Sequence, residues 1–177
     1  MKFKETEYGD LTGKHYKGDI VVSSMNLTSL EGAPKTVSGF FDCCKNKLTS
    51  LEHAPEEVGG YFDCSENKLK TLEGSSKKVG RSFHCMQNQL KTLVGGPEEV
   101  QIDYFCSNNQ LTSLEGLPKT IRGKFIFKNN PGKHLEEEFE IRKNNPNLSE
   151  IEIKIELVKR GFIKDEELEG LQDIFFL

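Results

Sequence analysis

The chain contains no tryptophan, and its small share of apolar side chains argues against a thick globular core. Hydrophobic residues make up 35% of the 177 positions and aromatic residues 9%. A compact domain of this length usually carries a larger apolar fraction. A repeat solenoid needs less, because neighbouring coils share one thin apolar column. The composition therefore favours an elongated repeat fold.

The charge balance and the absence of long apolar runs exclude two classes of partner. The chain has 24 basic and 28 acidic residues, for a net charge of −4, whereas nonspecific nucleic-acid binding needs a basic excess or stripe. No apolar run reaches the roughly 20 residues that a membrane-spanning helix requires. We therefore expect neither a nucleic acid nor a membrane as a partner.

Motifs for catalysis and cofactor binding are also missing. The sequence has no GxxxxGK[ST] loop, no GxGxxG after a strand and no HExxH pair. The first residues, Met1 to Asp10, are polar and lack the apolar segment of a secretory signal. We expect a protein without a cofactor or enzymatic activity that works in the cytoplasm, where its five cysteines stay reduced.

What the sequence does contain is a repeat of 21 residues. Residues 27–131 divide into five segments of equal length without insertion. Five apolar columns recur at that interval. They are Leu27, Leu48, Leu69, Leu90 and Leu111; Leu30, Leu51, Leu72, Leu93 and Leu114; Val37, Val58, Val79, Val100 and Ile121; Phe41, Phe62, Phe83, Tyr104 and Phe125; and Cys43, Cys64, Cys85, Cys106 and Phe127.

The spacing of these columns predicts the path of each coil. The phenylalanine and cysteine columns lie two residues apart, so they share one face of a strand, and the strands should stack as a parallel sheet. An asparagine follows three residues after the cysteine column and is expected to satisfy backbone groups of a tight turn. A proline in the opposite turn excludes a long helix there and predicts an extended or 3₁₀ path. Ser76 replaces that proline in the third coil, where we expect a looser turn.

These columns resemble the signature of leucine-rich repeats. The segment from Phe41 to Leu51 follows the pattern L-x-L-x-x-N-x-L-x-x-L, with Phe41 and Cys43 in its first two apolar places. The short coil with its proline turn is similar to the repeats of secreted bacterial effectors, and more so to repeat proteins of large tailed bacteriophages. The resemblance implies a leucine-rich-repeat solenoid over 27–131. It also implies, for a phage product, the host cytoplasm as location and a host protein as target.

Residues 1–26 are predicted to form an N-terminal cap and a degenerate first coil. Ile20 and Val22 align with the phenylalanine and cysteine columns, and Met25 takes the asparagine place. The polar segment from Tyr8 to Asp19 before them should add a capping strand or hairpin. A cap is needed because the end of a solenoid otherwise exposes its apolar core.

Residues 132–177 carry twelve acidic and seven basic residues and are predicted to form an acidic, mainly helical C-terminal cap. Helices are expected over 134–143 and 165–175. The segment 149–160 fits either a strand, from its alternating isoleucines, or a helix, which we favour because Gly161 is a good stop. The tail should pack on the last coil, unless its apolar end at 174–177 docks on a partner or a second copy.

Side chains that alternate with the inward columns should form a concave strand face with exposed aromatic residues. Aromatic residues and methionine are enriched in the centres of interfaces, and a monomer has little reason to expose them. We predict that ten residues of this face bind a partner protein, namely Phe40, Asp42, Tyr61, Asp63, His84, Met86, Asp103, Phe105, Lys124 and Ile126.

Two constellations could indicate chemistry instead of recognition. Asp42, Asp63 and His84 lie on one strip of the expected sheet and could bind a divalent ion or perform acid–base catalysis, but the sequence brings no nucleophile to them. The inward cysteines lack the CxxC pairs of zinc sites and pack well as small hydrophobic residues, while Cys44 should be a spare thiol on the concave face. The sequence therefore predicts no catalytic, cofactor-binding or metal-binding residue.

Three functions are compatible with this pattern. The favoured one is a non-enzymatic module, monomeric or weakly self-associating, that binds a partner protein through the concave face. The second is a structural protein that self-associates as part of an assembly. The third is a metal-dependent enzyme that uses Asp42, Asp63 and His84.

Overall fold

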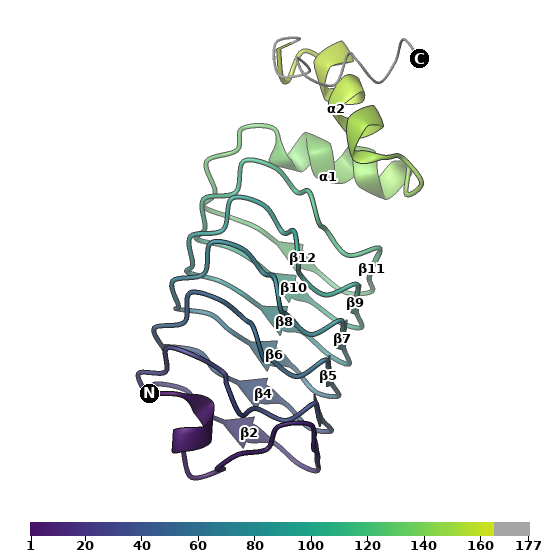
Figure 1. Ribbon diagram of the computed structural model, residues 1–177. Coiled ribbons are helices and arrows are strands. Elements are labelled where there is room, and N and C mark those ends of the chain that lie inside the picture. The colour runs from purple at the N-terminus through teal and green to yellow at the C-terminus, as the bar shows by residue number, and fades with distance from the viewer. Residues whose placement is uncertain (165–177) are drawn as a thin grey trace, which may run out of the picture.

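The protein is a parallel β-solenoid of about five full coils followed by two short helices, as a computed structural model of residues 1–164 describes it (Figure 1). Each coil contributes two-residue strands to two parallel sheets. The β2–β12 sheet contains β2 (Ile20–Val21), β4 (Phe41–Asp42), β6 (Phe62–Asp63), β8 (Phe83–His84), β10 (Tyr104–Phe105) and β12 (Phe125–Ile126). The β1–β11 sheet contains β1 (His15–Tyr16), β3 (Thr36–Val37), β5 (Glu57–Val58), β7 (Lys78–Val79), β9 (Glu99–Val100) and β11 (Thr120–Ile121).

The predicted stack of parallel strands is therefore confirmed for the β2–β12 sheet. The stretch after the proline turn, predicted to be extended or 3₁₀, is extended and forms the β1–β11 sheet. In both sheets each residue pairs with the residue 21 positions later, for example Phe41 with Phe62 and Val37 with Val58. A constant offset of one repeat stacks each column on itself.

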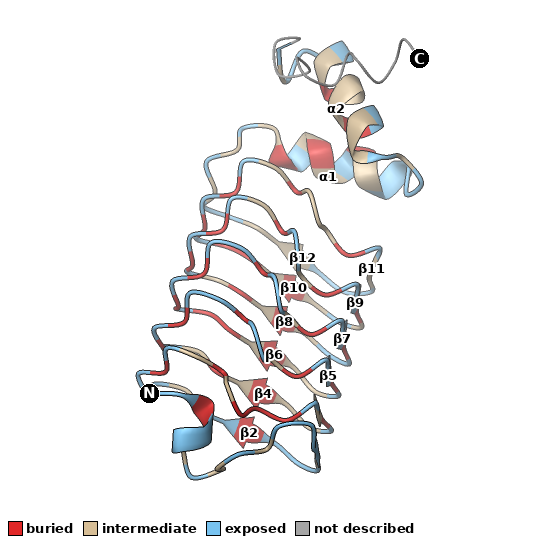
Figure 2. Cartoon of the chain, in the orientation of Figure 1, coloured by how far each residue is buried: buried red, intermediate tan, exposed pale blue. Residues whose placement is uncertain are grey.

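The apolar columns form one continuous core along the solenoid axis. Buried segments recur at the same places in successive coils (Figure 2). The rings of Phe41, Phe62 and Phe83 pack edge to face with centroids 5.5 Å apart. The column cysteines Cys43, Cys64, Cys85 and Cys106 are fully buried, which confirms their prediction as core residues. Burial of these apolar columns supplies most of the favourable free energy of folding.

A buried asparagine ties each coil to the preceding one. The side-chain oxygen of Asn67 accepts a hydrogen bond from the N–H of Leu48 at 2.9 Å, and its nitrogen donates to the carbonyls of Cys43 and Cys64 at 3.1 Å. Four further asparagines repeat this arrangement, namely Asn46, Asn88, Asn109 and Asn130. The predicted role of the asparagine column, to satisfy turn backbone, is confirmed.

The expected loosening of the third coil at Ser76 is wrong. Ser76 is fully buried, and its hydroxyl donates a hydrogen bond to the carbonyl of Pro55 in the preceding coil. A buried hydroxyl needs such a partner. The hydrogen bond of the serine therefore holds this turn against the turn of the preceding coil, where the other coils have a proline ring.

The N-terminal segment closes the first end of the core. Ile20 of β2 pairs with Phe41 as predicted, and β1 is the capping strand expected within 8–19. A short 3₁₀ helix, η1 (Phe3–Glu5), was not predicted. It buries the side chain of Phe3 completely, with its ring stacked 6.2 Å from that of Phe41. Phe3 covers the apolar face that the first coil would otherwise expose.

Two helices follow the last coil and agree with the sequence prediction. The α1 helix spans Leu135–Asn144, and α2 spans Glu150–Lys159, with the hydroxyl of Ser149 accepting a hydrogen bond from the N–H of Glu152 as an N-terminal cap. The helical alternative for 149–160 is thus confirmed. The helix expected over 165–175 and the docking of 174–177 lie outside the described residues.

Glu138 of α1 takes the place of a missing further coil. The N–H of Leu93 donates to the backbone oxygen of Glu115 in the next coil, whereas the N–H of Leu114 donates to the carboxylate of Glu138 at 2.9 Å. Glu138 is only 1% exposed, and the negative charge of its side chain is balanced by Arg142, which lies 2.7 Å from the carboxylate. A buried carboxylate is stable only when paired and hydrogen-bonded in this way.

Arg142 in turn connects the two helices, because it also contacts Glu150 of α2 at 2.6 Å. Burial alone would lower the pKa of Arg142, but its hydrogen bonds to Glu150 and Glu138 raise the pKa above its usual value. The guanidinium therefore stays charged and holds the cap together.

Removing the carboxylate with Glu138→Ala should destabilise the protein by about 2 kcal/mol or more, because it leaves the N–H of Leu114 unpaired and Arg142 with Glu150 as its one remaining partner. Urea unfolding followed by circular dichroism measures the change. Glu136→Ala, an exposed position of the same helix, serves as control and should shift stability by about 0.5 kcal/mol or less. Equal effects of the two substitutions would contradict the role of Glu138.

His53 occupies a backbone position of the repeat that favours glycine. Its φ is +69°, and glycine occupies the same place in the other coils, for example Gly74 with φ +84°. A non-glycine residue in this left-handed region costs about 1–2 kcal/mol. We expect His53→Gly to raise the stability by about 1 kcal/mol in the same urea experiment. Glu52→Gly, at the neighbouring exposed position, should lower it, and an equal gain from both changes would disprove the explanation.

Candidate interaction surface

The ten residues predicted to bind a partner lie on the outer face of the β2–β12 sheet, on the strands and on the residues that flank them. Lys124 is exposed and the other nine are half-buried. We call this surface the aromatic face, defined by Phe40, Asp42, Tyr61, Asp63, His84, Met86, Asp103, Phe105, Lys124 and Ile126. The strands that carry it are held in register by the columns underneath.

A continuous row of rings crosses the aromatic face. The rings of Phe40 and Tyr61 are stacked with centroids 4.5 Å apart and planes 7° from parallel. Tyr61 stacks on His84 at 6.0 Å, and His84 meets Phe105 edge-on at 4.8 Å. The expectation of exposed aromatic side chains needs correction, because each ring covers part of the next. The row offers rigid ring surface and edges to a ligand.

Acidic groups lie beside this row at its N-terminal end. Asp42 and Asp63 occupy paired positions on β4 and β6. One oxygen of Asp42 accepts a hydrogen bond from the N–H of Cys44 at 3.0 Å, and one oxygen of Asp63 accepts from the N–H of Ser65 at 2.8 Å. The N–H groups at these strand ends therefore orient both carboxylates.

The thiol of Cys44 joins the two carboxylates. One ligand atom each from Asp42, Cys44 and Asp63 lie within 4.8 Å of one another, and Nδ1 of His84 is 3.8 Å from Oδ2 of Asp63. Burial, a hydrogen bond to Asp42 and the two negative charges raise the pKa of Cys44 to about 12. Burial and the same carboxylates also raise the pKa of Tyr61. The side chain of Cys44 is therefore a protonated thiol at neutral pH, not a nucleophilic thiolate.

Asp103 has a different role from the other acids of the face. Its Oδ1 accepts a hydrogen bond from the N–H of Lys124 in the next coil at 2.7 Å. Asp19, in the same column, accepts from the N–H of Phe40 at 3.0 Å. The carboxylate of Asp103 thus links one coil to the next. This structural role explains the residue better than the predicted role in partner binding. Sequence reasoning missed this because the contact depends on the stacking register.

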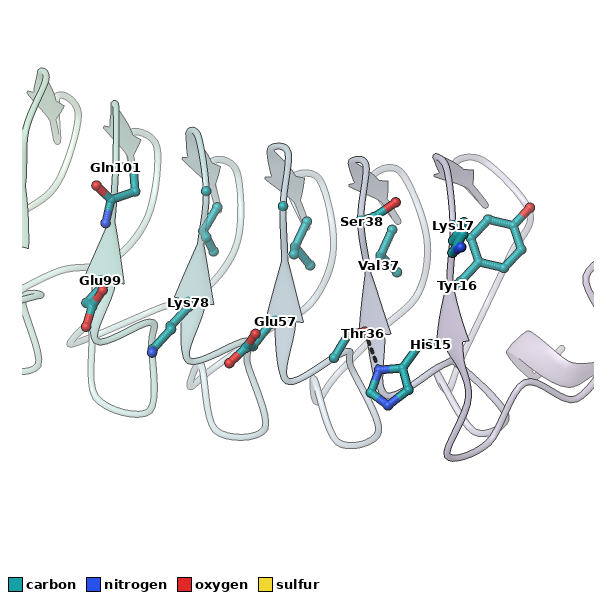
Figure 3. A pocket seen from close by; sticks show the side chains of 14 residues that line it. His15, Tyr16, Lys17, Thr36, Val37, Ser38, Glu57, Lys78, Glu99 and Gln101 are labelled. Carbon is teal, nitrogen blue, oxygen red and sulfur yellow. Dashed lines mark hydrogen bonds between the residues drawn. The ribbon is translucent and has the colours of Figure 1, made fainter.

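A groove on the outside of the β1–β11 sheet was not anticipated from the sequence. Its volume is about 540 Å³. Glu57, Lys78 and Glu99 follow one another along one edge, and a hydrogen bond joins His15 to Thr36 at its end (Figure 3). Gly59 and Gly80 also line the groove, and no sequence motif marked it. Alternating charges along a shallow groove do not indicate a particular ligand.

A second groove, of about 610 Å³, lies between the last coil and the helices. Its apolar lining includes Ile121, Phe125, Phe139, Leu148 and Ile153. Ile121 and Phe125, which belong to the last coil, are half-buried because no further coil within residues 1–164 covers them. We call this hollow the cap groove.

The burial of four column cysteines predicts unreactive thiols. Burial raises the pKa of Cys43, Cys64, Cys85 and Cys106. We therefore expect iodoacetamide to modify at most one thiol per native chain, at Cys44, and all five after unfolding in urea. Mass spectrometry counts the modified residues. The Cys44→Ser variant should show none in the native state, and two or more modified thiols in a chain that stays folded would contradict the buried arrangement.

Comparison of the chain with known protein families, with curated proteins and with solved structures finds no match. Within residues 1–164, no helix is both long and apolar enough to cross a membrane. The aromatic face combines rigid rings, oriented carboxylates and a neighbouring imidazole on one surface, and this combination carries the functional argument.

Proposed function

We propose that the protein is a non-enzymatic interaction module that binds a partner protein through the aromatic face. The observation that carries the proposal is the row of contacting rings from Phe40 through Tyr61 and His84 to Phe105. Aromatic residues dominate the energetics of protein interfaces, where they fill hydrophobic centres. The row gives the face such a centre.

The rigidity of the face supports binding at low entropic cost. Each ring is held by its neighbours, and the strands below are bound to both adjacent coils. Side chains that are already ordered lose little conformational freedom on association, so more of the contact energy appears as affinity. Asp42 and Asp63 at one end and Lys124 at the other give the face a polarity that would orient a partner.

Two observations favour binding over catalysis at this surface. The pKa of Cys44 is raised to about 12, mainly by burial, which disfavours a nucleophilic thiolate. The 3.8 Å between His84 Nδ1 and Asp63 Oδ2 is longer than the hydrogen bond by which a carboxylate orients a catalytic histidine. The enzymatic alternative has no comparable support.

We also propose that the coils are short leucine-rich repeats. In support, the leucine columns and the asparagine that follows the strand occupy the places of the family signature in every coil. The second sheet, in place of a helix, suits a coil of only 21 residues. A phage origin and a host protein as target rest on the sequence resemblance alone, and the proposed cytoplasmic location rests also on the polar first residues.

Self-association is the second candidate, and the cap groove favours it. An apolar hollow at one end of a solenoid could receive a second copy, which would make a structural or assembly protein. Light scattering over a range of concentrations separates the two proposals. A constant monomer mass supports the interaction module, and a mass that rises with concentration supports self-association.

The partner-binding proposal is tested with a triple variant, Tyr61→Glu, Met86→Glu and Phe105→Glu, which introduces three charges along the aromatic face. Affinity capture from cells of the native host, quantified by mass spectrometry, should show at least about a hundredfold loss of specific partners, because each buried anchor contributes about 2 kcal/mol or more.

The matched control places three glutamates at positions away from the aromatic face, with Thr49→Glu, Gln101→Glu and Thr112→Glu, and adds the same three negative charges. This control should retain the partners, and circular dichroism should show that both variants stay folded. Unchanged capture by the aromatic-face variant, or equal losses in the two variants, would overturn the proposal.

A further inference from the structure

Three side chains with metal-binding atoms converge at the N-terminal end of the aromatic face, and a histidine lies beside one of them. Asp42, Cys44 and Asp63 each bring one ligand atom within 4.8 Å of the other two, and His84 lies 3.8 Å from Asp63. In a tetrahedral zinc site with bonds of about 2.0–2.3 Å, neighbouring donor atoms are roughly 3.3–3.8 Å apart. Shifts of roughly 1 Å would bring the ligand atoms of Asp42, Cys44 and Asp63 to that spacing, and His84, the neighbour of Asp63, would supply the fourth ligand.

The backbone already orients two of these ligands. Asp42 and Asp63 each use one oxygen to accept an N–H from the residue two positions later, which leaves the second oxygen of each carboxylate available. The ring of His84 is held between Tyr61 and Phe105. A ligand set that is oriented before binding loses little freedom when the ion enters.

The charges of the cluster call for a cation. Two carboxylates at paired positions on adjacent strands repel each other. Among residues 1–164, neither forms an ion pair with a lysine or arginine, and the nearby Lys45 pairs with Glu66 at 3.7 Å. A divalent cation coordinated by both carboxylates would offset their repulsion, whereas an uncharged His84 ring would not.

The mixture of donor atoms selects the class of ion. Carboxylates alone suit Mg²⁺ or Ca²⁺, which prefer oxygen ligands. A thiolate and an imidazole instead favour Zn²⁺ and similar transition-metal ions. We propose that Asp42, Cys44, Asp63 and His84 bind one zinc-like divalent cation. The ion would join β4, β6 and β8, and this role requires no partner protein.

Cobalt, which replaces zinc and reports its ligands by colour, provides the test. Titration of the reduced, purified protein with Co²⁺ should saturate at one ion per chain, with visible bands of a four-coordinate site and a near-ultraviolet band from the cobalt–thiolate bond. Zn²⁺ should displace the cobalt and Mg²⁺ should not. Saturating Zn²⁺ should also raise the Tm by about 5 °C or more, because the ion binds only the folded chain.

Variants assign the ligands. Cys44→Ser should abolish the near-ultraviolet band, and Asp63→Asn and His84→Ala should each weaken cobalt binding at least about tenfold. Glu66→Gln, a neighbouring carboxylate outside the cluster, should bind as the unaltered protein does. Circular dichroism of the metal-free variants shows whether each is folded, and the absorption of the unaltered protein decides the question even if one is not.

No saturable absorption of the unaltered protein at millimolar Co²⁺ would overturn the metal site, as would unchanged binding by Cys44→Ser and Asp63→Asn. The metal titration uses the purified protein alone, so its outcome does not depend on whether the aromatic face binds a partner. Loss of the metal proposal and loss of the partner proposal are therefore separate results.

Discussion

A single buried amide in each coil determines how the coils stack. The asparagine accepts a hydrogen bond from the first backbone N–H of its own coil and donates to carbonyls of its own and the preceding coil, as Asn67 does with Leu48, Cys64 and Cys43. These partners are met only when successive coils have the same length, since an inserted residue would leave buried polar groups unpaired at a cost of about 1–3 kcal/mol each. The uniform spacing of 21 residues follows from this requirement, and so does the alignment of every outward column.

The two ends of the solenoid are closed by different chemistry. At the N-terminus the ring of Phe3 covers the core, and the backbone of residues 3 and 4 bonds with that of the first coil. At the C-terminus the carboxylate of Glu138 supplies an acceptor that a further coil would otherwise provide, with Arg142 as its counter-ion. An apolar plug needs no specific geometry, whereas the charged cap works only with its hydrogen bonds intact.

The sequence predicted the columns, the stacked strands, the asparagine contacts and the positions of α1 and α2, because each depends on a period or on a local capping signal. It did not predict the β1–β11 sheet as a sheet, since only one apolar column, from Val37 to Ile121, recurs in that stretch, and alternation needs two. The roles of Phe3 and Glu138 were missed because a single buried residue in a polar segment carries no periodic signal. On the aromatic face the aromatic residues were foreseen from two columns, but their packing into one row of contacting rings was not. The approach of Cys44 to Asp42 and Asp63 was not foreseen either, because it depends on how the chain turns after the strand.

Because all coils have the same length, the number of coils determines the height of the solenoid. Gain or loss of one whole coil would change the height of the stack by one strand spacing, roughly 4.8 Å, while both caps would keep their contacts. Such a change would add or remove the outward side chains of one coil, here called one rung, without disturbing those of the other coils. Duplication of 63 bases of coding sequence could therefore adjust the reach of the molecule in equal steps, and replacement of residues within one rung could alter its specificity.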